Sequence, residues 1–127
     1  MREEEELLIM QNKDSYSGSI IKEVRHEGHA VVLVLEGEID MDCSVELRNK
    51  FLELLKGKPS SLVVNMTQVE FMDSSGLGTL VEALKWSRKG GSEFKLAGLS
   101  QGVRNIFEIS KLESLFQIYG TEPEALS

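Results

Sequence analysis

The residues with the clearest potential for chemistry are Asp73, Ser74, Ser75 and Gly76, which follow one another in the chain. Asp and Ser commonly cap helices, because their side-chain oxygens accept hydrogen bonds from the free N–H groups of the first turn. The N-terminus of a helix also carries about half a positive charge and attracts anions. A serine at this point can be a hydrogen-bond anchor, a nucleophile or a site for adding a phosphate. Alternatively, Ser74 or Ser75 is simply an N-cap.

A strand and a helix must position these residues. An apolar run of strand length lies at residues 62–66, and apolar residues recur at helical spacing from Leu77 to Leu84. We therefore expect a helix over about residues 75–89, with the Asp-Ser-Ser-Gly stretch at the turn before it. Gly76 leaves this turn bare, so that another backbone can approach it closely.

The expected helix has two distinct sides. At 100° per residue its apolar stripe faces inward, and the opposite side carries Thr79, Ala83 and Trp86. A tryptophan on the outer side of a helix often anchors a partner protein. Trp86 is therefore a candidate binding residue; in the alternative interpretation it folds back onto a neighbouring loop.

The sequence lacks the common catalytic and cofactor motifs. Ser74 is not within a Gly-x-Ser-x-Gly elbow, and the stretch that follows it is neither a P-loop nor a dinucleotide fingerprint. His26 and His29 flank an expected turn without carboxylate or cysteine support for a metal. Cys43 has no activating base in its local sequence. We therefore expect no catalysis, no bound metal and no cofactor.

Composition indicates one globular domain of 127 residues with 41% hydrophobic residues. The net charge of −7 disfavours nucleic-acid binding, because an acidic surface repels phosphates. We expect no membrane association, since no apolar stretch approaches the roughly 18 residues of a spanning helix. The acidic N-terminus is unlike a secretory signal, and a single cysteine fits a reducing compartment. These features predict a cytoplasmic protein.

The pattern of elements predicts an α/β fold with the order ββαβαβαβα. We expect a mixed, mostly parallel sheet that begins with a hairpin and has helices packed on it. A polar loop is expected at residues 37–42, followed by a helix that Asp42 or Ser44 caps. The expected strands are at residues 20–25, 30–35, 62–66, 94–97 and 116–119.

Residues 1–17 differ from the domain at residues 18–127. They combine an acidic block, Glu3–Glu6, with an apolar patch, Leu7–Met10, and contribute −3 to the net charge. We expect a flexible acidic arm. In the alternative interpretation, Leu7–Met10 adds a strand to the edge of the sheet or to a partner.

Two motifs resemble one known family. The stretch from Phe71 to Gly78, Phe-Met-Asp-Ser-Ser-Gly-Leu-Gly, is similar to the signature loop of STAS domains, and specifically of bacterial anti-sigma factor antagonists. The upstream stretch Leu35–Asp40 resembles the Gly-Glu-hydrophobic-Asp turn of that family. With the helices downstream, the resemblance covers about residues 19–120.

This resemblance implies a regulator that works by partner switching. The unmodified protein would bind an anti-sigma factor that is also a serine kinase, and so release a sigma factor. The kinase would phosphorylate Ser74, with Ser75 as the alternative acceptor, and a PP2C-type phosphatase would remove the phosphate. ATP and metal would then belong to those partners. With Trp86, which the helical projection suggests, the expected partner-binding residues are Asp40, Asp73, Ser75, Gly76, Thr79 and Trp86.

Two alternatives remain at this point. Asp40 can be a loop cap and nothing more. The whole chain can also be a STAS module of a non-transcriptional assembly, such as a transporter-associated or lipid-transport subunit. The intact Asp-Ser-Ser-Gly stretch favours the anti-sigma factor antagonist, because the other modules need no phosphorylatable serine.

Overall fold

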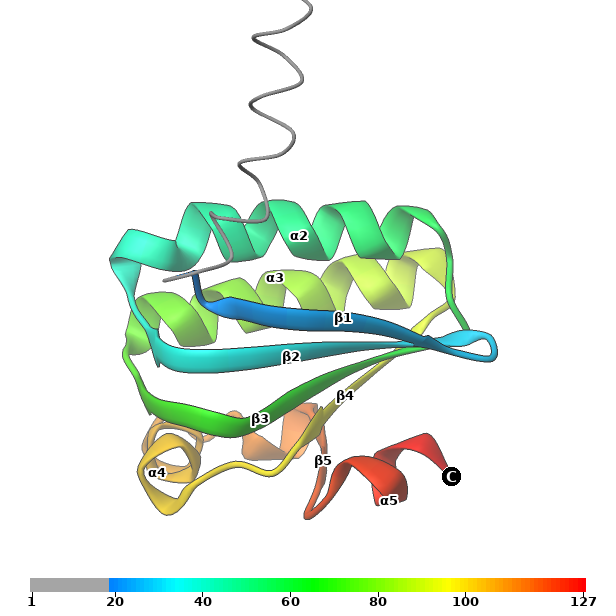
Figure 1. Ribbon diagram of the computed structural model, residues 1–127. Helices are drawn as coiled ribbons and strands as arrows, with labels where there is room; N and C mark the ends of the chain where they lie inside the picture. The colour runs from blue at the N-terminus through cyan, green and yellow to red at the C-terminus, as the bar shows by residue number, and fades with distance from the viewer. Residues whose placement is uncertain (1–18) are drawn as a thin grey trace, which may run out of the picture.

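A five-stranded sheet forms the centre of the protein, which the computed structural model describes over residues 19–127 (Figure 1). The predicted arm and its alternative, an added strand, lie outside the described residues. The first two strands form an antiparallel hairpin, and the remaining neighbours are parallel. In spatial order, the strands are β1 (Ile21–Glu27), β2 (Ala30–Ile39), β3 (Ser61–Met72), β4 (Glu93–Ala97) and β5 (Gln117–Tyr119).

Parallel neighbours need crossover connections, and helices supply them. Helices α2 and α3 lie side by side across one face of the sheet (Figure 1). Two short 3₁₀ turns, η1 and η2, precede α2 and β5. The helical segments are η1 (Met41–Cys43), α2 (Ser44–Lys56), α3 (Ser74–Gly90), α4 (Gln101–Ser110), η2 (Glu113–Leu115) and α5 (Glu122–Leu126).

The core divides between the two faces of the sheet. Side chains alternate along a strand, so Leu33 and Leu35 of β2 face α2, α3 and α4, whereas Val32 and Val34 face α5. The larger cluster also holds Phe51 and Phe94, whose rings meet edge to face with centroids 5.7 Å apart. The predicted α/β class and mixed sheet with an initial hairpin are confirmed.

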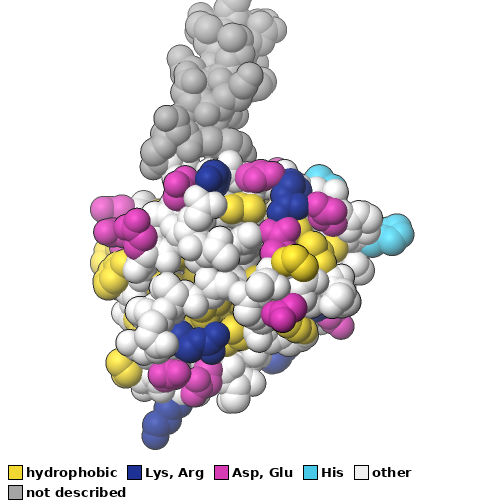
Figure 2. Space-filling model, turned by 60° about the horizontal axis from the view of Figure 1, so that its bottom comes forward, with side chains coloured by type: hydrophobic (Ala, Val, Ile, Leu, Met, Phe, Trp, Pro, Cys, Tyr) yellow, Lys and Arg dark blue, Asp and Glu magenta, His cyan; other side chains and the backbone are white. Residues whose placement is uncertain are grey.

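A polar clamp fixes α5 to the opposite face of the sheet. Arg25 Nη2 and Asn65 Nδ2 donate hydrogen bonds of 2.5 and 2.7 Å to the carboxylate of Glu122. Lys95 Nζ donates to the carbonyl of Ala125 at 2.9 Å. Figure 2 shows the side of the molecule near α5, where acidic and basic side chains are interspersed with small hydrophobic areas. Polar contacts from the sheet thus hold the short helix α5 in place.

The pKa of Glu122 reflects this clamp. Burial raises it, but the hydrogen bonds from Arg25 and Asn65 outweigh burial and hold the pKa below its ordinary value. A lowered carboxyl pKa in the folded state stabilises the protein above the pKa of the unfolded chain, and this stability is lost as the pH falls. Acid is therefore expected to loosen α5.

Replacing Glu122 with glutamine tests the clamp. We expect Glu122→Gln to lower the free energy of unfolding at pH 7 by about 1–2 kcal/mol, because it removes charge-assisted hydrogen bonds. The difference in the free energy of unfolding between this variant and the unmodified chain should shrink as the pH falls below about 4.3, the ordinary glutamate pKa. Urea unfolding at several pH values measures both effects. Glu108→Gln, at an exposed position of α4, is the matched control and should change neither; a constant difference at all pH values would contradict the clamp.

Two strands are longer than the sequence predicts. β2 continues to Ile39 and β3 to Met72, so residues 37–39 belong to a strand and the predicted loop at 37–42 is wrong for them. The register of the pair shifts between Gly37 and Glu38, where Gly37 has a φ of 110°. This irregularity lets Ile39 return to the core, although its neighbours are polar. β3 therefore runs directly into the cap of α3, without an intervening loop.

Candidate functional site

Asp73 begins the site, because it follows β3 directly and is the N-cap of α3. Its Oδ1 accepts hydrogen bonds from Ser75 N at 2.9 Å, Gly76 N at 3.1 Å and the Ser75 hydroxyl at 2.6 Å. The Ser75 hydroxyl and then the Gly76 N–H lower the pKa of Asp73, since they stabilise its charged form. The alternative in which Ser74 or Ser75 is the N-cap is therefore wrong.

The two serines have different surroundings. Ser74 is the first residue of α3 and is exposed. Within residues 19–127 its hydroxyl has no hydrogen-bond partner. The Ser75 hydroxyl, in contrast, is held by Asp73, and the carbonyl of Ser75 accepts from Thr79 Oγ1 at 3.0 Å. Ser74 thus presents a free nucleophilic oxygen at a helix N-terminus, and Ser75 is part of the cap.

Asp40 lies beside this cap on the neighbouring strand. Ile39 of β2 is paired with Met72 of β3, so Asp40 and Asp73 occupy equivalent positions at two adjacent strand ends. Asp73 N also donates to the carbonyl of Ile39 at 3.1 Å. Asp40 caps η1, where its carboxylate accepts from Asp42 N at 3.0 Å. Asp40 can therefore cap η1 and also lie on the same edge of the sheet as Ser74, so its two predicted roles are compatible.

The start of α2 differs from the prediction. Its N-cap is Cys43, whose side chain accepts no hydrogen bond from the first turn of the helix and instead donates to the carbonyl of Asp40 at 3.4 Å. The prediction that Asp42 or Ser44 caps α2 is therefore wrong. Burial raises the pKa of the Cys43 thiol, which keeps it in the less reactive protonated form.

Gly76 is buried and allows a close contact between α3 and β2. A Cβ at this position would lie 2.6 Å from Ile39 Cγ2, 2.7 Å from Met72 Cγ and 2.9 Å from the Ile39 carbonyl oxygen. The backbone that approaches Gly76 is thus a strand of the same domain. Gly76 therefore allows the first turn of α3, which carries Ser74, to pack closely against β2.

The helical projection placed some residues on the wrong side of α3. Thr79 is only 5% exposed and Ala83 is buried, although both were predicted on the outer side. The projection considered only packing on the sheet, whereas α2 packs against the flank of α3 and widens its buried arc. Thr79 still reaches the surface at the edge of a hollow of about 420 Å³, which Val45 and Ser75 also line.

Trp86 lies between the two helices. It is partly buried, packs against the core, and has the Arg48 guanidinium 5.6 Å from its ring centre. Arg48 in turn pairs with Glu82 at 3.2 Å. Both the outward-facing position and the alternative fold onto a loop are therefore wrong; the ring contacts α2.

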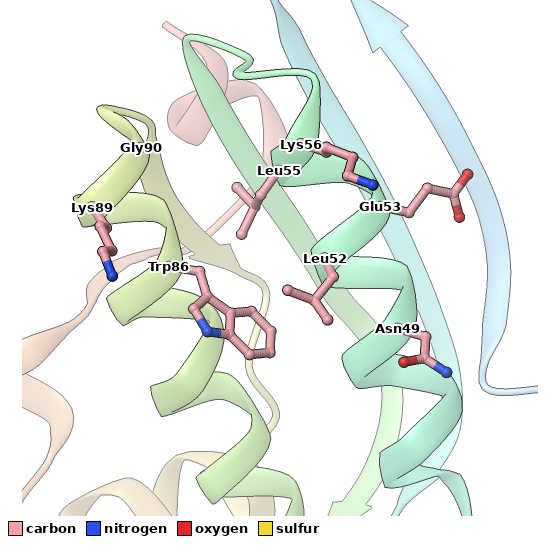
Figure 3. A pocket seen from close by; sticks show the side chains of 8 residues that line it. All are labelled: Asn49, Leu52, Glu53, Leu55, Lys56, Trp86, Lys89 and Gly90. Carbon is pink, nitrogen blue, oxygen red and sulfur yellow. The ribbon is translucent and has the colours of Figure 1, made fainter.

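A second hollow begins at this ring. It has a volume of about 590 Å³ and is lined by residues of α2 and α3, among them Leu52, Leu55, Lys56, Trp86 and Lys89. We call it the α2–α3 groove. Leu52 and Trp86 point toward each other across it (Figure 3). Lys56 and Lys89 lie at the C-terminal ends of the two helices, with Lys56 on the side of Glu53 and Lys89 on the side of α3 away from α2.

Three exposed hydrophobic residues near the strand ends were missed in the sequence. Met41 in η1 is 72% exposed, Val45 in the first turn of α2 is 67% exposed, and Phe71 is 51% exposed. Phe71 could have been found by alternation, because its neighbour Met72 is buried and so Phe71 must face outward. An apolar surface of this kind next to a free serine is suited to binding a protein.

Two other kinds of site to consider in residues 19–127 are a metal centre and a membrane span. Residues 19–127 contain no group of histidine, cysteine and carboxylate side chains placed to hold a metal ion. Over the same residues, none of the helices has the length and apolar character needed to cross a membrane.

Comparisons with known proteins match this geometry. Residues 22–125 match the STAS domain. The anti-sigma-B factor antagonist of Listeria monocytogenes is 36% identical over 105 residues, which cover 82% of this chain and 90% of the relative. Among solved structures, the anti-sigma factor antagonist SpoIIAA in its unphosphorylated form has a TM-score of 0.70 and 26% identity, and the match covers 82% of this chain and 91% of the SpoIIAA chain.

SpoIIAA, a cell fate determinant of Bacillus, has also been solved in its phosphorylated form. That structure has a TM-score of 0.65 and 25% identity, and the match covers 82% of this chain and 95% of the other. A family match over most of the chain and a relative of this similarity show the family. The chain therefore belongs to the STAS domain family, and its named relatives there are anti-sigma factor antagonists.

Proposed function

We propose that this chain is an anti-sigma factor antagonist that works by partner switching. In its unmodified form it binds an anti-sigma factor and so frees a sigma factor. A phosphate on Ser74 ends that binding. The observation that carries the proposal is the exposed, unpartnered hydroxyl of Ser74 at the start of α3, next to a neighbour whose hydroxyl is already engaged.

The position of Ser74 suits a reversible negative charge. A phosphate adds a charge of about −1.5 to −2, and the N-terminus of α3 stabilises it, so the fold tolerates the modification. An interface that covers Ser74 would have to desolvate the same charge. Leaving a charge buried without a partner of opposite sign costs about 3–5 kcal/mol. About 1.4 kcal/mol corresponds to a tenfold change in affinity. One phosphate is therefore enough to disrupt a complex.

The partner surface that we propose surrounds Ser74. Met41, Val45 and Phe71 supply exposed apolar area, and Asp40 and Asp73 supply charge. The remaining predicted residues have different parts in this surface: Thr79 borders it, Ser75 and Gly76 hold its shape, and Trp86 lies further along the helices.

The modifying enzymes are separate proteins in this proposal. The anti-sigma factor is itself the serine kinase that uses ATP, and a PP2C-type phosphatase restores Ser74. The chain has a regulatory role and no catalytic one. Because sigma factors act in the cytoplasm, we place the protein there. The phosphorylated form of SpoIIAA supports this scheme, as it belongs to a relative with the same fold.

Mapping the phosphate tests the proposal. The purified chain is incubated with an anti-sigma factor kinase from the same organism and ATP, and intact mass and peptide mass spectra are recorded. We expect one phosphate, on Ser74, and none in Ser74→Ala, whereas Ser75→Ala should still be modified. A phosphate on Ser75 would overturn the assignment. No phosphate, with a kinase shown to be active on another substrate, would favour the non-transcriptional STAS module.

A further inference from the structure

The α2–α3 groove is an apolar cavity that no described residue fills. Leu52 is 42% exposed, and it faces the partly buried ring of Trp86 across the groove (Figure 3). Exposed apolar side chains that face each other across a cavity are typical of a binding surface. The groove lies at the ends of α2 and α3 that are distant from Ser74, and Trp86 alone links it to the surface proposed above.

Two lysines give one end of the groove a positive charge. Lys56 lies in the last turn of α2 and Lys89 in the last turn of α3. Within residues 19–127 neither has an ion-pair partner. They stand out in a protein whose net charge is −7, and they would attract an acidic segment.

One segment of this chain has the matching chemistry. Residues 3–10 read Glu-Glu-Glu-Glu-Leu-Leu-Ile-Met, an acidic block followed directly by an apolar patch. The groove has an apolar floor and a pair of lysines; Glu53 also lines it, but its carboxylate forms an ion pair with Lys50 at 2.9 Å. The charge and the apolar character of the segment and of the groove are therefore complementary.

The chain enters the domain at a point from which this segment can reach the groove. The hydroxyl of Ser19 donates to the carboxylate of Glu46, in the first turn of α2. Leu52 lies six residues further along α2, about 9 Å, and crossing the helix adds about 10 Å. Residues 11–18 span up to about 26 Å when extended, which is more than enough.

The order of the parts also agrees. Along the chain from Ser19 backwards come Leu7–Met10 and then Glu3–Glu6. Along α2 from Glu46 come Leu52 and then Lys56. The apolar patch thus meets the apolar floor first, and the acidic block reaches the lysines. A short tether gives an effective concentration of about a millimolar, so even weak contacts suffice.

We propose that residues 3–10 dock in the α2–α3 groove of their own chain, with Leu7–Met10 against Leu52 and Trp86 and with Glu3–Glu6 against Lys56 and Lys89. This replaces the flexible arm that the sequence alone favours. In combination with the proposed function, on which this consequence rests, the docked segment covers Trp86 and competes with the partner at this outlying part of its surface. Displacing it then becomes a step in forming the complex.

Trp86 is the one tryptophan of the chain, so its fluorescence reports on the groove without any partner. We would compare acrylamide quenching in the full chain and in a variant carrying Leu7→Ser, Leu8→Ser and Ile9→Ser. The matched control carries Asn12→Ser, Ser15→Ala and Ser17→Ala in the connecting segment. We expect stronger quenching and a red-shifted emission in the first variant and no change in the control.

A charge swap tests the acidic contacts. Lys56→Glu with Lys89→Glu should increase quenching, and adding Glu4→Lys and Glu5→Lys should reverse the increase. Equal quenching in the unmodified chain and the triple-serine variant would overturn the docking. It would also be overturned if Glu4→Lys and Glu5→Lys failed to reverse the increased quenching of the double lysine variant. A difference that depends on protein concentration would assign the segment to a second copy and also overturn it. None of these results depends on phosphorylation of Ser74, so they are separable from the proposed function.

Discussion

Ser74→Asp is expected to weaken binding to the anti-sigma factor by about a hundredfold or more, because it places an uncompensated charge within a buried interface. The free energy of unfolding should change by no more than about 0.5 kcal/mol, as is usual for exposed positions. Ser74 is exposed at the first position of α3, where the helix dipole favours a carboxylate. The affinity therefore changes while the fold does not.

Titration calorimetry and urea unfolding measure the two quantities on the same protein. Ser74→Ala is the control: it removes the hydroxyl without adding charge, and it should keep both the affinity and the stability. If Ser74→Asp unfolded the domain, the tolerance of the helix N-terminus for charge would be refuted. If it bound the partner as well as the unmodified chain, Ser74 would lie outside the interface.

Gly76→Ala is expected to lower the free energy of unfolding by about 2 kcal/mol, although alanine is the better helix former. The added methyl group would lie 2.6 Å from Ile39 Cγ2 and 2.9 Å from the Ile39 carbonyl oxygen. A side chain can turn away from such a contact, but the backbone of β2 is held in the sheet. The first turn of α3 must therefore move away from β2.

Gly78→Ala, two residues further along the same helix, is the matched control. A Cβ at Gly78 would meet nothing within 4 Å, so the helix propensity of alanine should add about 0.5–1 kcal/mol of stability. The two substitutions are chemically identical and have opposite expected signs. Urea unfolding of both variants decides the matter, and a stabilising Gly76→Ala would refute the close packing of α3 on β2.

The order of elements and the position of the serines could be predicted, because both depend on local pattern. The apolar run at residues 62–66 and the helical spacing after Leu77 fix β3 and α3, and Ser74 lies between them. Strand ends could not be predicted. Ile39 and Met72 extend the sheet because each strand hydrogen-bonds with the other, which is a property of the pair rather than of either segment.

Contacts between helices were the other missing part. The periodicity of α3 can be read from the sequence, but the presence of α2 on its flank cannot, so the sequence predicts an exposed Thr79 and an outward-facing Trp86. The distinction between Ser74 and Ser75 also required the structure, because either can cap a helix by its residue type. Only the hydrogen bond from the Ser75 hydroxyl to Asp73 shows which serine is engaged.

The site combines a rigid support with a free group. Asp73 and Gly76 fix the start of α3 through the cap and through close packing on β2. Ser74 projects from this support with its hydroxyl unpartnered among residues 19–127. A modification of Ser74 therefore changes the surface charge without requiring a change of fold, which is what a switch between partners needs.

The most direct test of the partner switch is the affinity of one anti-sigma factor for two forms of this chain, unmodified and phosphorylated on Ser74. Titration calorimetry should show binding of the unmodified form, at least about a hundredfold weaker binding of the phosphorylated form, and full recovery after phosphatase treatment. Equal affinity of the anti-sigma factor for the two forms would contradict the switch.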